Sequence, residues 1–274
     1  MELQALLKQP QALPAVPKIV HELIDSFNNE DVSIGEVSRK LAADPVLSAR
    51  LLRLANTAHY HVTRTIGTVE EAVAVLGFVT VRTLVISSGL TGSFKALPGM
   101  DLQSFWRYSL NTATVSRWLS RQTHHNADQA FTVGLMHAIG QLIMHSGMPE
   151  QMLQADKLVP PLDSRRFDLE RTSFGYDFSK VGAALARAWK FPLAFAEAIE
   201  GFPDPLAGEP FDPMAGILHL AAWRARAEHN GLSTDEMRAI FPTAVAERLN
   251  ISADILEQMP PLEELSAGLE ALLG

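Results

Sequence analysis

The sequence predicts an all-α fold, and three observations support that prediction. Apolar residues recur with the roughly 3.6-residue period of a helix along nearly the whole chain. No segment alternates apolar and polar residues as a strand does, and no Asn-Gly or Asp-Gly pair lies between two such segments. Three stretches have the capping-box pattern, in which a hydroxyl residue precedes a glutamate by three positions: Ser33–Glu36, Thr68–Glu71 and Ser233–Glu236.

Helices are expected where start signals and apolar stripes coincide. The capping boxes predict helices over 34–43, 69–95 and 234–249. Asp44-Pro45 begins another at 45–57, because proline at the first helical position loses no hydrogen bond. Gly77 is expected to let another helix approach the long helix 69–95 closely. Apolar stripes predict the remaining helices over 17–28, 102–123, 128–146, 149–158, 164–173, 178–190, 193–200, 213–229 and 252–273.

Two connections divide the chain into three expected segments. Pro98-Gly99 lies between two long helical patterns, and Phe202 to Pro213 contains four prolines and one glycine. We therefore expect an N-terminal helical lobe over 1–98, a second helical lobe over 99–210, and C-terminal helices over 211–274 packed on the second lobe.

Composition excludes several classes of function. The chain has 274 residues, of which 47% are hydrophobic, enough to bury a large core, and it has no cysteine for a disulfide, zinc finger or thiol nucleophile. We see no signal peptide, and the longest apolar run ends well short of the roughly 20 residues that span a bilayer. A soluble cytoplasmic protein is expected. Residues 211–274 hold 10 acidic and 4 basic side chains, which argues against a polyanion-binding surface there.

Three segments of the first lobe carry a family resemblance. They are L-P-A-V-P-K-I-V (13–20), A-D-P-V-L-S-A-R-L-L-R-L-A-N-T-A-H-Y (43–60) and I-G-T-V-E-E-A-V-A-V-L-G-F-V-T-V-R-T-L-V-I-S (66–87). In this order and spacing the chain resembles the HDOD family, the HD-related output domains of bacterial signalling proteins, over about residues 13–203. The resemblance implies an N-terminal helical bundle packed on a lobe related to the HD phosphohydrolases. It also implies a regulatory or scaffolding role in place of catalysis.

The same resemblance lets the metal-ligand positions of HD phosphohydrolases be compared with this sequence. Such enzymes need several imidazoles and carboxylates around one or two cations. Tyr108 stands in the place of the first histidine, and His137-Ala138 in the place of the His-Asp pair. The later positions correspond to Phe178, to Gly201-Phe202 and to Ala222.

Only His137 and His219 remain as donors at or near these positions, and both lie within apolar helices. We therefore predict a vestigial site with no metal, no cofactor and no catalytic residue, in which both histidines are buried core residues.

Other candidate constellations are weaker. His59, His61 and the stretch His124–Asp128 lie at expected helix ends or loops, and we interpret them as surface features. The four tryptophans (106, 118, 189 and 223) fall in apolar stripes and are interpreted as core. No phosphate-binding loop, zinc-protease motif or serine-hydrolase motif is present.

The sequence therefore predicts a non-catalytic bacterial signal-transduction module that acts by binding. Its expected partner is a protein of a signalling pathway, with a small ligand in a cleft between the lobes as a further possibility and no membrane partner. An alternative is a DNA-binding regulator, because residues 34–57 resemble a helix-turn-helix with Arg50 and Arg53 on its second helix. Nucleic acid is nevertheless not the expected partner, since that lobe is electrically neutral. A third alternative is a metal-dependent phosphohydrolase with an unrecognised site.

Overall fold

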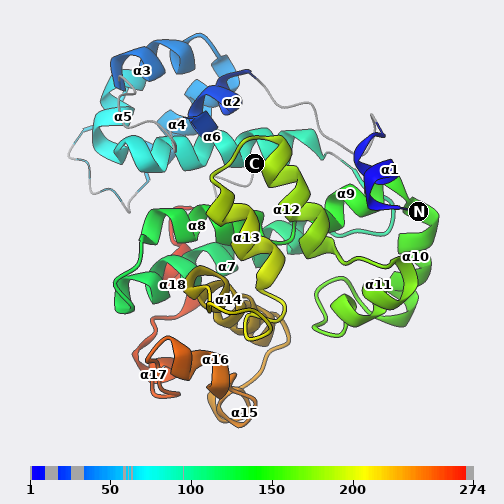
Figure 1. The fold of residues 1–274 in the computed structure, drawn as a ribbon. Coiled ribbons are helices and arrows are strands. Elements are labelled where there is room, and N and C mark those ends of the chain that lie inside the picture. Colours follow the sequence, from blue (N-terminus) through cyan, green and yellow to red (C-terminus); the bar gives the residue numbers. More distant parts are fainter. Residues whose placement is uncertain are drawn as a thin grey trace. The chain divides into compact units, whose positions relative to one another are not determined.

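The protein is helical throughout the part of the chain that the structure describes. The computed structural model describes residues 2–9, 18–25, 34–57, 60, 62, 64–94 and 96–269. Within these ranges every regular element is a helix and none is a strand (Figure 1). The all-α prediction is confirmed.

The chain forms two compact units. Unit 1 comprises Met1–Leu13, Ala96–Ala188 and Leu193–Leu265, and unit 2 comprises Pro14–Lys95, Trp189–Pro192 and Ser266–Gly274. The division into two lobes over 1–98 and 99–210, with C-terminal helices over 211–274 packed on the second, stays a prediction.

Unit 2 is built from five helices before residue 95. They are α2 (Lys18–Asp25), α3 (Ile34–Ala42), α4 (Pro45–Ala55), α5 (Val69–Leu76) and α6 (Phe78–Ser93). Asp44 begins α4 as predicted, since its carboxylate accepts the backbone N–H groups of Val46 and Leu47 at 2.9 and 3.1 Å. Ser33, the expected cap of α3, lies outside the described residues.

Gly77 breaks the helix that the sequence predicts over 69–95. Its φ of 76° and ψ of 154° fall in a region that glycine alone occupies without strain. Helices α5 and α6 are consequently bent by 112°. A Cβ added at Gly77 would meet no atom of the described residues within 4 Å, so none of the described helices makes the expected close approach.

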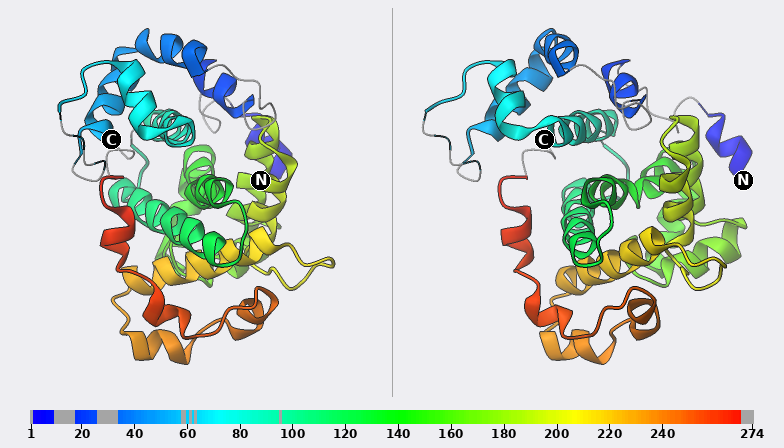
Figure 2. Two further views of the ribbon diagram at one scale, coloured as in Figure 1. Left: turned by 90° about the vertical axis from the view of Figure 1, so that its left-hand side faces the viewer. Right: turned by 60° about the vertical axis from the view of Figure 1, so that its left-hand side comes forward.

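Unit 1 contains the remaining helices, which Figures 1 and 2 show from three directions. They are α1 (Leu3–Leu7), α7 (Leu102–Gln122), α8 (Ala127–Met136), α9 (Ile139–Gly147), α10 (Pro149–Leu158), α11 (Arg166–Phe174), α12 (Phe178–Ala188), α13 (Leu193–Gly201), α14 (Pro213–His229), α15 (Thr234–Ala239), α16 (Thr243–Arg248), α17 (Ile255–Gln258) and α18 (Leu262–Ser266). Helix α7 packs against α8 and α14, and α12 packs against α9 and α13. The short helix α1 was not predicted.

The predicted helix 128–146 is interrupted at His137-Ala138. Ala138 has φ −103° and ψ 5°, outside the helical range, and α9 begins after it. The new direction brings Gly140 of α9 against the backbone of α12. A Cβ on Gly140 would lie 1.9 Å from the carbonyl oxygen of Phe178 and 2.8 Å from the nitrogen of Gly182. The break thus coincides with a close tertiary contact between α9 and α12.

The C-terminal helices cover the core of unit 1. Val115 and Leu119 of α7 form a buried cluster with apolar residues of α14, α16 and the segment that follows, as far as Leu262. Prolines interrupt two further predicted helices. Pro242 separates α15 from α16 within the predicted helix 234–249, and Pro260-Pro261 separates α17 from α18 within 252–273. The capping box at Ser233–Glu236 is formed as predicted.

No single helix in the described part of the chain is long and apolar enough to cross a membrane. The bent pair α5 and α6 meets the criterion by length and composition when its two helices are taken together.

The contact between α9 and α12 predicts that Gly140→Ala is destabilising. The added methyl group would collide with backbone atoms, which cannot rotate away as a side chain can. We expect a loss of at least about 1–3 kcal/mol in the free energy of unfolding, measured by urea denaturation. Gly201→Ala is the matched control, since its Cβ would make an ordinary 3.5 Å contact with Ala215. Equal stability of the two variants would contradict this packing.

Candidate functional site

The positions that correspond to the HD ligand set all lie in unit 1, on four pieces of structure. Tyr108 is on α7, His137 and Ala138 form the break between α8 and α9, and Phe178 begins α12. His219 and Ala222 are one turn apart on α14. We refer to these six residues as the HD positions.

Aromatic rings connect three of the six HD positions, Tyr108, His137 and Phe178. The ring of His137 packs edge-on against Tyr108 and Phe202, with centroids 5.0 and 5.4 Å away. Phe178 stacks on Phe167 at 4.7 Å, and both contact Phe202, at 6.3 and 5.5 Å. All five side chains are buried, so this space is occupied by ring atoms.

His137 is a neutral imidazole in this setting. Its Nδ1–H donates to the carbonyl oxygen of Gly134 at 2.7 Å, which leaves the lone pair on Nε2. Nε2 is buried and has no hydrogen-bond partner among the described residues. Burial lowers the pKa of His137 to about 3, and the positive charge of Arg226 acts in the same direction.

His219 is held in a similar way but is only half-buried. Its Nδ1 bonds to the carbonyl oxygen of Phe202 at 2.8 Å, and burial lowers its pKa. The guanidinium of Arg226 donates to the hydroxyl of Tyr108 at 3.1 Å. A guanidinium therefore lies beside the HD positions, and the sequence analysis did not anticipate it.

The side chains at the HD positions do not fit a divalent cation. Two imidazole nitrogens, Nε2 of His137 and of His219, could in principle donate, whereas Ala138 and Ala222 offer none. None of the six HD positions carries a carboxylate to bind a cation, and the nearby Arg226 would repel it. Among the described residues no group of three or more His, Asp or Glu side chains is placed to hold a metal ion.

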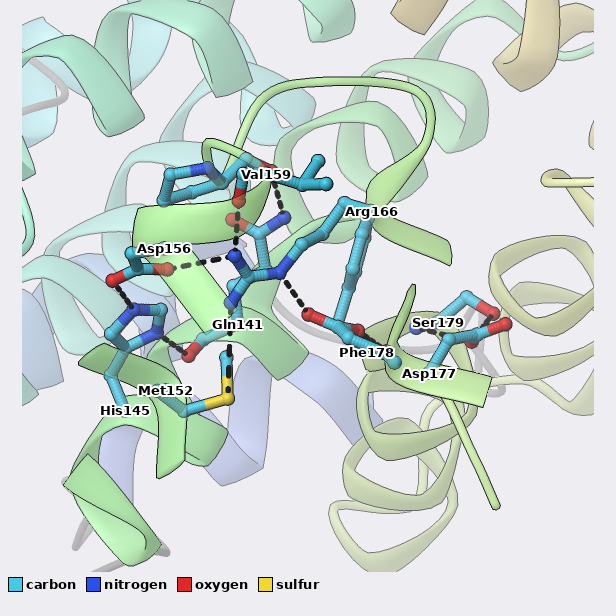
Figure 3. A network of polar contacts seen from close by, with 11 residues as sticks. Gln141, His145, Met152, Asp156, Val159, Arg166, Asp177, Phe178 and Ser179 are labelled. Carbon is cyan, nitrogen blue, oxygen red and sulfur yellow. Dashed lines mark hydrogen bonds and ion pairs between the residues drawn. The ribbon is translucent and has the colours of Figure 1, made fainter. Parts of the chain in front are cut away.

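A second cluster, unrecognised in the sequence, lies around Arg166 (Figure 3). The guanidinium of Arg166 is fully buried on α11. Its Nε donates to Oε1 of Glu170 at 2.7 Å, and its Nη1 bonds to the carbonyl oxygen of Val159 at 2.6 Å. Nη1 also lies 2.8 Å from Oδ1 of Asp156 on α10. This single side chain therefore ties α10 and α11 to the loop between them.

Glu170 extends the cluster to α12. Its second oxygen, Oε2, accepts the backbone N–H of Phe178 at 2.7 Å. Burial raises the pKa of Glu170 to about 7, although the ion pair with Arg166 opposes that rise. One carboxylate thus joins Arg166 to the first residue of α12, whose ring is part of the aromatic cluster.

His145 of α9 closes the other end of the cluster. Its Nδ1 lies 2.7 Å from the carbonyl oxygen of Gln141, and its Nε2 lies 3.0 Å from Oδ2 of Asp156. Both partners are acceptors, so two bonds require either an imidazolium or a proton on Asp156. The cluster thus pairs the buried guanidinium of Arg166 with the carboxyl groups of Asp156 and Glu170, and His145 contacts the first of these.

The sequence contained a partial signal for this cluster. Arg166 and Glu170 are four residues apart on a predicted helix, the spacing of a helical ion pair. Such pairs are usually exposed, as the neighbouring pair of Arg165 and Asp163 is, so the spacing alone does not show that this pair is buried.

The remaining candidates are reported by their places. His124 and His125 are exposed at the end of α7, where His125 bonds to Thr123, whereas His59 and His61 lie outside the described residues. In the helix-turn-helix-like segment, Arg50 is half-buried and donates to Thr91 of α6 at 3.4 Å. Arg53 is exposed.

The buried charges predict that Arg166→Met is strongly destabilising. Removing the guanidinium leaves two carboxylates without their cation, and losing one member of a buried ion pair costs about 3–5 kcal/mol. Arg165→Met is the adjacent control, because its partner Asp163 is bound at the surface and the change should stay within experimental error. Chemical denaturation of both variants measures the difference. A loss as small in Arg166→Met as in Arg165→Met would show that the cluster contributes little.

Solved structures and sequences of other proteins are similar to this chain. One is a protein of Shewanella amazonensis SB2B that is provisionally named a phosphohydrolase and is 33% identical in sequence. Its crystal structure superposes with a TM-score of 0.78 over 98% of this chain and 96% of that one. A protein of Marinobacter aquaeolei VT8, provisionally named a signal transduction protein, superposes with a TM-score of 0.74 at 21% identity, over 100% of this chain and 60% of its own. An uncharacterised protein of Treponema pallidum is 24% identical over 217 residues, 76% of this chain, and this chain spans 41% of that relative's length.

The family model of the HDOD domain matches residues 13–205. That region contains both the segments 43–60 and 66–87 and the HD positions up to Phe178. The chain belongs to the HDOD family.

Proposed function

We propose that this protein is a non-catalytic regulatory module that acts by binding a partner in a signalling pathway. The HDOD match and the likeness to a protein named for signal transduction support a regulatory role. The non-catalytic part of the proposal depends on the site itself.

The observation that carries the proposal is the mutual packing of side chains at the HD positions. Hydrolysis of a phosphate ester by an HD-type site needs a cation that activates water and binds phosphoryl oxygens. Here the rings of Tyr108, Phe178 and Phe202 pack together with the neutral His137. Opening this cluster for an ion would expose buried apolar surface and leave the ion without a carboxylate.

A second candidate function is phosphohydrolysis, which the name of the 33% identical Shewanella protein favours. The buried Nε2 of His137, which has no hydrogen-bond partner in the described part of the chain, would be one ligand of such a site. Ala138 stands in the place of the aspartate of the His-Asp pair and Ala222 in the place of the last ligand, and their methyl groups cannot bind a cation. We therefore favour binding over hydrolysis.

The test is a combined metal and activity measurement on the full chain. After gentle purification, elemental analysis should find no stoichiometric transition metal. With added manganese, phosphodiester, nucleotide and phosphomonoester substrates should show no turnover above the uncatalysed rate. Ala138→Asp should not restore activity, since Ala222 and Phe178 still supply no ligand.

His137→Ala provides the matched control for that experiment. If the wild-type protein binds a stoichiometric metal, and both the metal and any turnover disappear in His137→Ala, the chain is an enzyme and the proposal is wrong. Turnover that persists in His137→Ala would come from a contaminant or from another site.

A further inference from the structure

Arg226 is the one cationic side chain of α14 that the structure places against the HD positions, among the described residues. It follows Ala222 by four residues and His219 by seven, so the three lie on one face of the helix. Arg226 and His219 are half-buried, whereas Ala222 is fully buried between them. Arg226 therefore reaches Tyr108 from a position that remains accessible to solvent.

The guanidinium of Arg226 has more donors than partners. It carries five N–H groups, and its one side-chain hydrogen bond within the described residues goes to the hydroxyl of Tyr108. No carboxylate of those residues lies within ion-pair distance of it. Asp163, whose pKa Arg226 helps to lower, is bound instead by Arg165 at 2.6 Å. Among the described residues, the half-buried guanidinium thus has no carboxylate in direct ion-pair contact.

His219 adds an acceptor to the same face. Because its Nδ1 donates to the carbonyl oxygen of Phe202, its Nε2 keeps a lone pair. Two donors of a guanidinium match two oxygens of a carboxylate or a phosphoryl group. A carboxylate at neutral pH has no proton to give to an imidazole lone pair, whereas a phosphate group with a second pKa near 6 carries a P–OH part of the time. His219 and Arg226 together therefore favour a phosphoryl group over a carboxylate.

We propose that the face of α14 bearing His219 and Arg226 binds a phosphoryl group, with the guanidinium holding two oxygens and Nε2 of His219 accepting from the third. This inference rests on the proposed function, because a site that binds phosphate through a guanidinium and holds no cation would bind without cleaving. It names the ligand chemistry that such a regulatory module would sense.

The experiment titrates the full chain with inorganic phosphate and, separately, with glycerol phosphate at constant ionic strength, followed by calorimetry. Acetate is the third probe. Saturable binding of both phosphates is expected in the wild-type protein, with weaker binding of acetate. Binding of inorganic phosphate alone would identify the free ion as the ligand, and tighter binding of the monoester would identify an esterified phosphate.

Three variants make the test specific. Arg226→Met should abolish binding, and Arg226→Lys should weaken it by about tenfold or more, because a lysine cannot reproduce the two-pronged contact. Arg224→Lys is the matched control: Arg224 lies two residues away, pairs with Glu228 at 2.9 Å and should leave binding unchanged. Circular dichroism checks that each variant is folded. If Arg226→Met does not fold, Arg226→Lys still tests the inference, because it keeps a positive charge at this position.

Equal affinity in Arg226→Met and the wild-type protein would overturn the inference, as would the lack of saturable binding at millimolar phosphate. Acetate binding as tightly as phosphate would overturn the preference for a phosphoryl group. Release of phosphate from the bound monoester would contradict the proposed function while leaving the binding site in place. Lack of binding together with lack of turnover would contradict this inference alone.

Discussion

A buried arginine that must keep its charge balanced is the constraint on which the second half of unit 1 depends. Removing a guanidinium from water is costly unless carboxylates and carbonyl oxygens replace the water, and Arg166 has Glu170, Asp156 and the carbonyl of Val159. None of these groups can move far without leaving a charge unpaired in the interior. The result is that α10, α11 and their connecting loop are held in one arrangement.

This arrangement determines what fills the HD positions. Phe167 follows Arg166 on α11, and Phe178 is fixed through its backbone N–H by Glu170. Their stacked rings then meet Phe202, which packs on His137. The polar cluster around Arg166 and the aromatic cluster at the HD positions are therefore joined through α11 and the first residue of α12. An ion at the HD positions would have to displace rings that buried charges hold in place.

Local signals in the sequence predicted the helix starts, because a cap is made by residues a few positions apart. Asp44 and Ser233 begin their helices as predicted. The breaks at Pro242 and at Pro260-Pro261 have a local signal as well, since proline interrupts a helix. The break at His137-Ala138 was not predicted in this way, and it coincides with the close contact between Gly140 and the backbone of α12.

The sequence likewise predicted some residues of the candidate site and not others. A family resemblance located Tyr108, His137 and Phe178, and the structure brings these residues into one connected cluster of rings. The sequence could not indicate that Arg166 is buried or that Arg226 reaches Tyr108, which is 118 positions away along the chain. The burial of Arg166 depends on how α10 packs against α11, and the contact of Arg226 depends on how α14 packs against α7. Such packing is a property of the whole fold.

The central claim is that side chains, and no cation, occupy the HD positions, and anomalous diffraction tests it most directly. Crystals of the full chain grown with excess manganese would be measured at the manganese absorption edge. The account predicts no manganese peak within bonding distance of His137 or His219, with the rings of Tyr108, Phe178 and Phe202 still in contact. A manganese peak bonded to Nε2 of His137, with the rings moved apart, would contradict it.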